Sequence, residues 1–242
     1  LNECELSHLA RSAIDVALAS TQHAAYEQAL RDLGCEVHQL PEQAALPDSV
    51  FVEDTAIVLD EVAFITHPGA VSRRPEVDSV AAMVGKYREL VRITSPATLD
   101  GGDVLRLGRT LYVGISARSS RSGIEQLSRL LARFDYQVKA VPLHGCLHLK
   151  TAVTQVALDL LLINPEWIDA SQFAGMRALH VVQSEPHAAN ALMIGDKVIY
   201  PESHPRTHEQ LIRNGIEVIS VDMSETEKAE GGVTCCSLIF DA

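Results

Sequence analysis

Alternating apolar and polar positions recur along this chain as pairs of short segments, each pair divided by a tight turn. Strict alternation predicts a half-buried strand, and two such strands around a two-residue turn predict a β-hairpin. Four hairpins are predicted on this basis, at residues 53–69, 101–114, 149–165 and 190–205. Their turns fall near Asp60-Glu61, at Gly108-Arg109, near Ala157-Leu158 and at Gly195-Asp196.

Helical segments follow most of these hairpins. Residues 74–90 are helix-like, and residues 118–134 space their apolar positions close to the helical period of 3.6. Residues 206–215 predict a helix that leads into a strand at 216–221. The N-terminal stretch 24–41 predicts a helix and a strand, and the apolar run "VTCCSLIF" at 233–240, after a Gly-Gly turn signal, predicts another strand.

The hairpins recur at roughly 40–50 residues, a spacing typical of repeated structural modules. Each β-β-α-β unit is too small to bury its own apolar face, so packing around a common centre in a propeller-like α/β array is expected. No stretch has the composition of a linker, which predicts a single domain over residues 1–242. The alternative is a doubly wound α/β domain, but that fold needs long parallel crossovers rather than hairpins.

Composition narrows the classes of partner. Among 242 residues, 47% are hydrophobic and 21% are charged, as in a soluble globular protein, and the formal net charge is -12. Without a basic stripe, nucleic acid is not an expected partner, whereas the negative field favours a small cation. No apolar run has membrane-spanning length. The five cysteines are irregularly spaced, which argues against a disulfide framework and favours a reducing cytoplasm.

Polar residues cluster where the predicted hairpins begin. They are Asp48, Glu53, Asp54, Asp100, Asp103, His148, Lys150, Asn190 and Cys235. If the modules surround an axis, distant parts of the chain bring a thiol, an imidazole and several carboxylates to one place. A cysteine nucleophile needs a base or a cationic neighbour to become a thiolate, and a histidine oriented by an acid meets that need.

Each of these residues also has a purely structural interpretation. Taken alone, a cysteine like Cys235 is more often a buried inert thiol, and a histidine like His148 is more often a hydrogen-bonded strand residue. The segment "LDGGDVL" suits ordinary turn chemistry. Cys235 and Cys236 are unsuited to bond to each other, because adjacent Cα atoms lie about 3.8 Å apart, below the usual disulfide range. In a strand the two thiols face opposite sides. A zinc site built from Cys146, Cys235, Cys236 and His148 fits no usual ligand spacing.

Several longer segments together resemble the dimethylarginine dimethylaminohydrolases, of the pentein or guanidino-group-modifying superfamily. The segments are "LPDSVFVEDTAIV", "ITHPGAVSRRPEV", "TLDGGDVL", "LYVGISARSS", "LHLKTA", "AANALMI", "YPESHPRT" and "GGVTCCSLIF". They span nearly the whole chain. The resemblance implies an α/β propeller of five β-β-α-β modules, in agreement with the repeat, and a hydrolase that needs neither metal nor cofactor.

The resemblance also implies a role for individual residues. It implies a catalytic set of Cys235, His148 and Asp100, with Cys236 as a non-catalytic neighbour. It implies substrate-binding roles for Leu6, Asp48, Glu53, Asp54, Arg73 and Arg118. In this scheme Glu53 and Asp54 hold the guanidinium group, the Asp48, Arg73 and Arg118 side chains contact the amino-acid end, and Leu6 belongs to a loop over the site.

The implied reaction is hydrolysis of Nω-methylated arginine to citrulline and an amine, through a covalent thiouronium on the cysteine. Arginine deiminases resemble this pattern but carry aspartate two residues after the histidine, where this chain has Lys150. That difference favours methylated arginine as the substrate. The rival interpretations are an arginine deiminase or amidinotransferase, and a non-catalytic guanidine- or metal-binding protein. A cytoplasmic enzyme is expected, with a homodimer as a candidate assembly and with no nucleic-acid or membrane partner.

Overall fold

A computed structural model describes residues 1–242, and its internal contacts divide the chain into two compact units. Unit 1 comprises Leu1–Gln39 and Thr151–Thr234, and unit 2 comprises Leu40–Lys150 and Cys235–Ala242. Each unit is therefore assembled from segments that are distant in sequence. The expectation of one domain over 1–242 stays a prediction.

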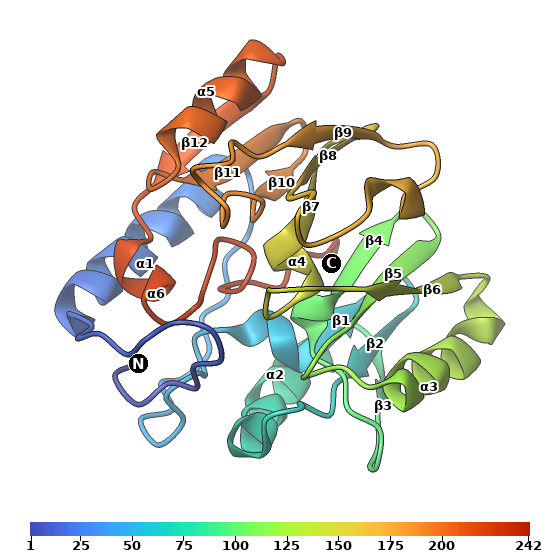
Figure 1. Ribbon diagram of the computed structural model, residues 1–242. Helices are drawn as coiled ribbons and strands as arrows, with labels where there is room; N and C mark the ends of the chain where they lie inside the picture. Colours follow the sequence, from blue (N-terminus) through green and yellow to red (C-terminus); the bar gives the residue numbers. More distant parts are fainter. The chain divides into compact units, whose positions relative to one another are not determined.

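The elements are labelled in Figure 1 in chain order. The helices are α1 (Val16–Asp32), α2 (Val77–Val84), α3 (Arg121–Leu131), α4 (Leu149–Ala152), α5 (Pro205–Arg213) and α6 (Ser224–Glu227), with 3-10 turns η1 (Val52–Thr55), η2 (Val71–Glu76), η3 (Gly101–Asp103), η4 (Ala132–Phe134) and η5 (Ala170–Gln172). The strands are β1 (Ala56–Val58), β2 (Val62–Ile65), β3 (Glu89–Arg92), β4 (Val104–Leu107), β5 (Thr110–Ile115), β6 (Gln137–Pro142), β7 (Val153–Ala157), β8 (Leu160–Ile163), β9 (Arg177–His180), β10 (Leu192–Ile194), β11 (Lys197–Pro201) and β12 (Glu217–Val221).

The strands form four separate three-stranded sheets, in the orders β1-β2-β3, β4-β5-β6, β7-β8-β9 and β10-β11-β12. In each sheet the first two strands are an antiparallel hairpin, and the third strand pairs in parallel with the second. A parallel third strand requires a crossover, which α2, α3 and α5 supply in three of the sheets and η5 in the fourth. The predicted α/β class and its β-β-α-β modules are confirmed for these four repeats.

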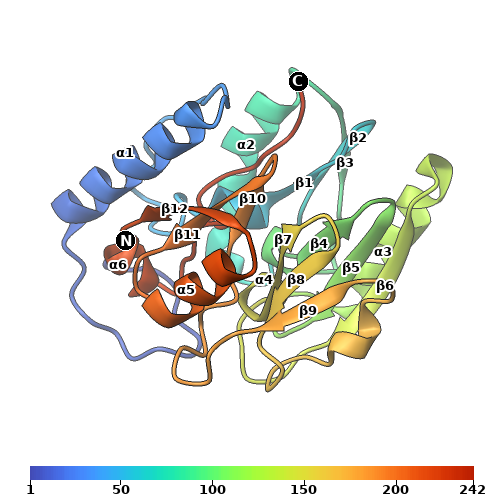
Figure 2. The same ribbon diagram turned by 90° about the horizontal axis from the view of Figure 1, so that it is seen from above.

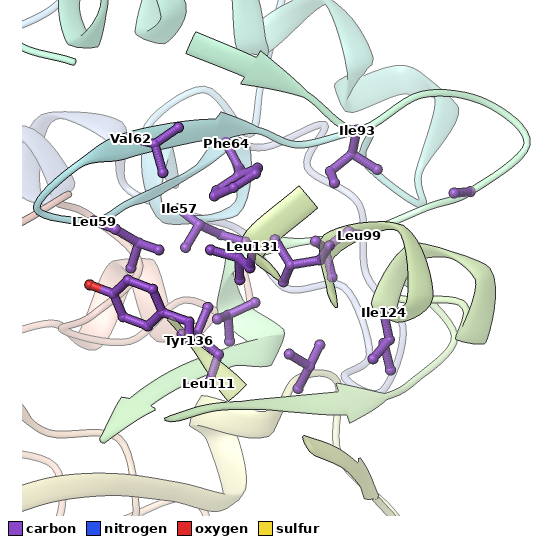
Figure 3. Packing of buried hydrophobic residues seen from close by; sticks show 14 residues of the cluster. Ile57, Leu59, Val62, Phe64, Ile93, Leu99, Leu111, Ile124, Leu131 and Tyr136 are labelled. Carbon is purple, nitrogen blue, oxygen red and sulfur yellow. The ribbon is translucent and has the colours of Figure 1, made fainter. Parts of the chain in front are cut away.

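The alternation that predicted the first hairpin also explains its packing. In the β1–β2 register, Ile57 lies opposite Phe64 while Ala56 lies opposite Ile65, so the two pairs occupy opposite faces of the sheet. Ile57 and Phe64 pack with residues of β4, β5 and α3, including Leu127, in the cluster drawn in Figure 3. Ala56 and Ile65 instead pack against α2. Both faces of this small sheet are thus buried within unit 2.

Unit 1 repeats the arrangement around its own core. Side chains from β7 and β8 pack with Val198 and Tyr200 of β11 and Leu211 of α5. Pro205 begins α5 at the position where a helix has no use for an N–H donor, and α5 runs beside β12, as Figure 2 shows from above. Helix α1, capped by Asp15, contacts β12 and α6.

Some predicted boundaries are wrong. Residues 233–240 form a turn followed by irregular chain, so "VTCCSLIF" is not a strand and strand alternation does not separate the two cysteines. The predicted strand within 24–41 is also absent, since that stretch contributes only part of α1. Residues 74–90 contain η2, a shorter α2 and the start of β3. The third turn lies at Leu158-Asp159, one residue later than predicted, next to a register shift between Gln155 and Ala157.

None of the helices combines the length and the apolar character that crossing a bilayer requires. All five cysteines are free thiols in the structure.

Candidate active site

The short turn η1 carries two adjacent buried acids, Glu53 and Asp54, immediately before β1. The Thr66 hydroxyl donates to the Asp54 carbonyl, which fixes the turn against the strand that follows. The Glu53 N–H donates to the carbonyl of Cys235 at 3.1 Å. This bond ties the backbone of Cys235 to the turn that carries the two acids, although the two segments are far apart in sequence.

His148 lies between two carboxylates. Its Nε2 is 3.2 Å from Asp100 Oδ2, and its Nδ1 is 3.8 Å from Asp54 Oδ1. The second Asp100 oxygen accepts the Gly69 N–H at 2.9 Å, and the Asp100 side chain has no exposure to solvent. A carboxylate held at both oxygens orients the imidazole rigidly, which is the relation expected for a catalytic histidine and its acid.

Electrostatics keep His148 protonated. Burial alone would lower its pKa, but the carboxylates of Asp54, Asp103 and Asp100 outweigh burial and raise the pKa to about 9. Burial would raise the pKa of Asp54, but His148 and Arg73 outweigh it and lower the pKa to about 2. The site therefore holds a His148 imidazolium next to an ionised Asp54 carboxylate at neutral pH.

Arg73 is buried and forms an ion pair with Asp54. Its Nη1 donates to Asp54 Oδ2, while its Nε and Nη2 donate to Glu76 Oε2 at 3.0 and 2.9 Å. Nη2 also reaches the Phe51 carbonyl at 3.0 Å. Burial would lower the pKa of Arg73, but these acids raise it above the ordinary value, so the guanidinium stays charged. Three of its nitrogens are engaged by the protein, which links Arg73 to the carboxylate that would hold a substrate.

Asp48 and Arg118 are both buried in loops of unit 2. The Asp48 carbonyl lies 3.4 Å from Arg73 Nη2, at the same cluster of charges. The Arg118 N–H donates to the Ser116 hydroxyl at 3.0 Å. Its backbone is packed on Gly69, where an added Cβ would lie 2.6 Å from the Arg118 α-carbon. The absence of a side chain at Gly69 therefore lets the loop that contains Arg118 pack close to Asp100. The N–H of Gly69 also donates to the Asp100 carboxylate.

Lys150, two residues after His148, forms an ion pair with Glu53, whose Oε1 lies 2.6 Å from Nζ. Both side chains are largely buried. The acid that would hold a guanidinium thus already has a cationic partner in the protein. A lysine here lowers the net negative charge of the site, where an aspartate would have increased it.

The three thiols of unit 2 that lie in or next to these segments differ in their surroundings. Burial and Glu53 raise the pKa of Cys236 to about 12, and burial and Asp103 raise the pKa of Cys146 to about 12. Both are therefore held as unreactive thiols at neutral pH. Cys235 is only partly buried. The two adjacent cysteines therefore differ in burial, as predicted. They lie in a turn rather than in the predicted strand.

Leu6 belongs to unit 1 and is partly buried there. The three residues after it, Ser7 to Leu9, point successive N–H groups at the Glu230 carboxylate over 2.5–3.1 Å. Successive N–H groups of this kind form an anion-binding nest, here filled by a side chain of the same unit.

Sequence reasoning missed several residues that support the site. Glu76, Gly69, Ser116 and Ser119 hold Arg73, Asp100 or Arg118 in place. The one signal in the sequence was the spacing of Arg73 and Glu76, three residues apart, which brings them together on a helical turn. The others act across sheets and loops, where no local pattern marks them.

Position 102 requires glycine because a larger side chain would clash with its neighbours, and not only because the residue lies in a turn. A Cβ there would lie 2.6 Å from Asp54 Oδ1 and 2.8 Å from His148 Nδ1. We expect Gly102→Ala to displace the imidazole and lower kcat on the order of 100-fold. Gly108→Ala is the control: its Cβ meets nothing within 4 Å, but its φ of +58° strains alanine. It should lower the melting temperature while leaving kcat unchanged; similar kcat losses in both variants would contradict the steric account.

A metal site is the main alternative use of these side chains. Asp54, Asp100 and His148 offer ligand atoms within 4.8 Å of one another. An imidazole must be unprotonated at the ligating nitrogen, so a metal ion would have to displace a proton from His148, whose pKa is raised to about 9. The cysteines do not join this group, so the zinc set of Cys146, Cys235, Cys236 and His148 is not assembled. The donor set fits an imidazolium and a bound organic cation better than a metal ion.

Known proteins share this architecture. The sequence profile of the family described as N,N dimethylarginine dimethylhydrolase, eukaryotic, matches residues 5–240. The N(G),N(G)-dimethylarginine dimethylaminohydrolase of Pseudomonas aeruginosa is 36% identical over 236 residues, which cover 97% of this chain and 92% of the relative. The Streptomyces coelicolor protein of the same name is 38% identical over 239 residues, covering 98% and 92%.

Solved structures extend the comparison. A Cys-to-Ser variant of the Pseudomonas aeruginosa enzyme in complex with citrulline superposes with a TM-score of 0.92 at 36% identity, covering 98% of this chain and 93% of that one. A His-to-Gly variant of a dimethylarginine dimethylaminohydrolase, as an adduct with S-methyl-L-thiocitrulline, gives the same TM-score, identity and coverage. The cyanobacterial arginine dihydrolase domain, at 22% identity and a TM-score of 0.84 with coverage of 93% and 87%, shares the fold alone.

Proposed function

Because this chain belongs to the dimethylarginine dimethylaminohydrolase family, we propose that it hydrolyses the guanidinium C–N bond of Nω-methylated arginine. The products are citrulline and dimethylamine or methylamine. The observation that carries the proposal is the buried imidazolium of His148, held between Asp54 and Asp100. The backbone bond from Glu53 to Cys235 ties the segment that bears the nucleophile to the turn that carries Asp54.

In this proposal the two ends of the substrate meet different charges. Glu53 and Asp54 bind the guanidinium through charge-assisted hydrogen bonds, since both are buried acids. Arg118 binds the α-carboxylate with its planar guanidinium, and Asp48 binds the α-ammonium group. Arg73 contributes by holding Asp54, to which it already donates. The substrate-binding role of Leu6 stays a prediction.

The reaction starts from thiolate at Cys235 and a protonated His148. The sulfur attacks the guanidinium carbon, and His148 gives its proton to the departing amine, which leaves a thiouronium on Cys235. The neutral imidazole then takes one proton from water as the water oxygen attacks the same carbon. The tetrahedral adduct breaks its C–S bond to release the thiolate and citrulline, and the remaining hydroxyl proton passes to solvent. Asp100 orients the ring in both steps. The raised pKa of His148 is suited to the first step, because the acid is protonated before the amine leaves.

Lys150 supports methylated arginine over arginine. The lysine pairs with Glu53 at a position where a second carboxylate would bind unmethylated guanidinium nitrogens. A site without that carboxylate has less reason to reject methyl groups.

The test is a comparison of kcat/KM for asymmetric dimethylarginine, monomethylarginine and arginine, followed through citrulline formation. The proposal predicts higher values for both methylated substrates. A higher value for arginine would favour a deiminase, and transfer of the amidino group to an added amine would favour an amidinotransferase. Saturable binding with no product from any of the three would favour a non-catalytic guanidine-binding protein.

Arg118→Ala should raise KM for free methylated arginine roughly ten- to a hundredfold, since a charge-assisted hydrogen bond contributes about 1.5–3 kcal/mol. KM for a small guanidine without a carboxylate should change little, because the lost contact is absent from both complexes. Steady-state kinetics with both substrates make the check. Equal losses would mean that Arg118 has a structural role only.

We also propose that the enzyme acts in the cytoplasm, which is supported by five free thiols. Its partner is the small-molecule substrate. A homodimer, and the absence of nucleic-acid and membrane partners, stay predictions.

A further inference from the structure

Asp103 has no assigned role in the proposed reaction, yet it is fully buried next to it. It follows Asp100 on the turn η3, where its N–H donates to the Asp100 carbonyl at 3.1 Å. Gly114 of β5 gives its side chain room, since a Cβ there would lie 2.7 Å from Asp103 Oδ1. A buried carboxylate is costly unless it is hydrogen-bonded, so its partners indicate what it is for.

One oxygen of Asp103 fixes the segment that bears His148. Oδ1 accepts the Leu149 N–H at 2.9 Å, directly after the histidine. Leu149 begins the short helix α4, whose first N–H groups have no partner within the helix. The carboxylate therefore anchors the backbone at the point where the imidazole is presented to Asp54 and Asp100.

The other oxygen fixes the loop that bears Arg118. Oδ2 accepts from the Ser116 hydroxyl at 2.6 Å, and the Ser116 oxygen in turn accepts the N–H groups of Arg118 and Ser119, each at 3.0 Å. A hydroxyl has one donor and two acceptor positions, so this hydroxyl is fully used. The Ser119 hydroxyl also bonds to Asp103 and accepts the Asp100 N–H at 3.0 Å.

We propose that Asp103 is the positioning residue of the site. Its carboxylate fixes the acid–base histidine through Leu149 and the carboxylate-binding arginine through Ser116, and so fixes the position of one relative to the other. The assignment rests on the proposed function for the roles of His148 and Arg118. Asp103 acts through these neighbours and does not touch the substrate, because its side chain is buried and both its oxygens are occupied.

The Asp103→Asn variant changes the charge and the hydrogen bonds of this side chain but not its size, so its effects report on positioning and not on packing volume. Its oxygen still accepts the Leu149 N–H, but its amide then faces the Ser116 hydroxyl, whose lone pairs are already filled. The Ser116 bond is lost and the Arg118 loop is released. The negative charge facing His148 is lost as well, which removes one of the three acids that raise the pKa of that imidazole.

We expect Asp103→Asn to lower the His148 pKa by about one unit, the lower end of the range for a nearby opposite charge. The readout is an NMR titration of the histidine rings, with the His148 signal identified by its loss in a His148→Asn variant. The charged groups that face His148 are Asp54, Asp100 and Asp103, and Cys146 also faces Asp103. Repeating the titration in a Cys146→Ala background excludes an effect of the Cys146 thiol on the measured His148 pKa.

Kinetics on methylated arginine give the second readout. Asp103→Asn should lower kcat and raise KM together, and its alkaline limb of kcat/KM should move to lower pH. Ser116→Ala keeps the charge and the Leu149 contact but releases the loop of Arg118. It should raise KM roughly tenfold, since two N–H groups lose their acceptor, with kcat and the His148 pKa unchanged.

Glu225→Gln is the matched control, because Glu225 is a buried acid of unit 1 that accepts the Asp15 N–H at 2.9 Å. It should leave the His148 pKa, kcat and KM unchanged. The proposal is overturned if Asp103→Asn behaves like this control. If Asp103→Asn does not fold, the proposal is overturned by a Ser116→Ala variant with unchanged KM. If the wild-type protein turns over no methylated arginine, the proposed function fails, while the NMR titration still decides whether Asp103 acts on His148.

Discussion

Replacing Cys235 by serine is expected to lower turnover of methylated arginine by roughly 10⁴–10⁶-fold, the range for removing members of a nucleophilic triad. A serine hydroxyl is not ionised near neutral pH, whereas a cationic substrate bound next to a thiol favours the thiolate that attacks. The fold should be unaffected, because Cys235 is only partly buried and the bond to Glu53 uses its backbone carbonyl.

Cys236→Ser is the matched comparison and should keep much of the activity. Cys236 is buried, and burial with Glu53 raises the pKa of its thiol to about 12, so it has no reactive thiolate to lose. A serine hydroxyl left unpaired there costs roughly 1–3 kcal/mol of stability. Steady-state rates and thermal melting of the two variants make the check. The reverse pattern, an active Cys235→Ser and an inactive Cys236→Ser, would make Cys236 the nucleophile.

A His148→Gly variant should accumulate a covalent thiouronium on Cys235 that hydrolyses slowly. Attack by sulfur remains feasible, because a cationic substrate beside the thiol favours its ionised form. Hydrolysis needs a base for water, and losing that base slows the step roughly 10²–10⁴-fold. S-methyl-L-thiocitrulline is a suitable probe: it forms the adduct in a His-to-Gly variant of a relative. Its leaving group is a thiolate, which needs no proton from His148.

Peptide mass spectrometry of the trapped variant locates the adduct, and fragmentation assigns it to Cys235 or Cys236. Adduct formation should rise with pH as the thiol ionises. Asp100→Asn is the companion variant: it keeps the imidazole, so its adduct should hydrolyse faster than that of His148→Gly. If substrate binds but no adduct forms at any pH, His148 is needed before attack. An adduct on Cys146 or Cys236 would remove Cys235 from the mechanism.

The hairpins were predictable because their signals are local. Gly108-Arg109 and Gly195-Asp196 both lie between antiparallel strands as predicted, with the glycines at φ of +58° and +61° that the turns require. The stretch 233–240 was not predictable in the same way. An apolar run becomes a strand only where a partner edge pairs with it, and this segment instead begins with a turn in which the Cys235 carbonyl accepts the Glu53 N–H.

The types of residue in the site were predictable, but several of their partners were not. His148 and Asp100 were paired in advance through the family resemblance, and they lie 3.2 Å apart. The ion pair of Lys150 with Glu53 joins residues 97 positions apart, and nothing in either segment marks it. Arg73 is expected at the amino-acid end of the substrate, and its protein partners Asp54, Glu76 and Phe51 could not all be predicted. Such assignments depend on tertiary packing, which local sequence does not encode.

The central claim, hydrolysis of methylated arginine at a carbon first bonded to Cys235, is tested most directly by turnover in ¹⁸O-labelled water. Asymmetric dimethylarginine is incubated with the protein, and the products are identified by mass spectrometry. The account predicts equal amounts of dimethylamine and citrulline, with one ¹⁸O in the ureido group of the citrulline, and neither product with Cys235→Ser. Release of ammonia in place of dimethylamine, or undiminished turnover by Cys235→Ser, would contradict it.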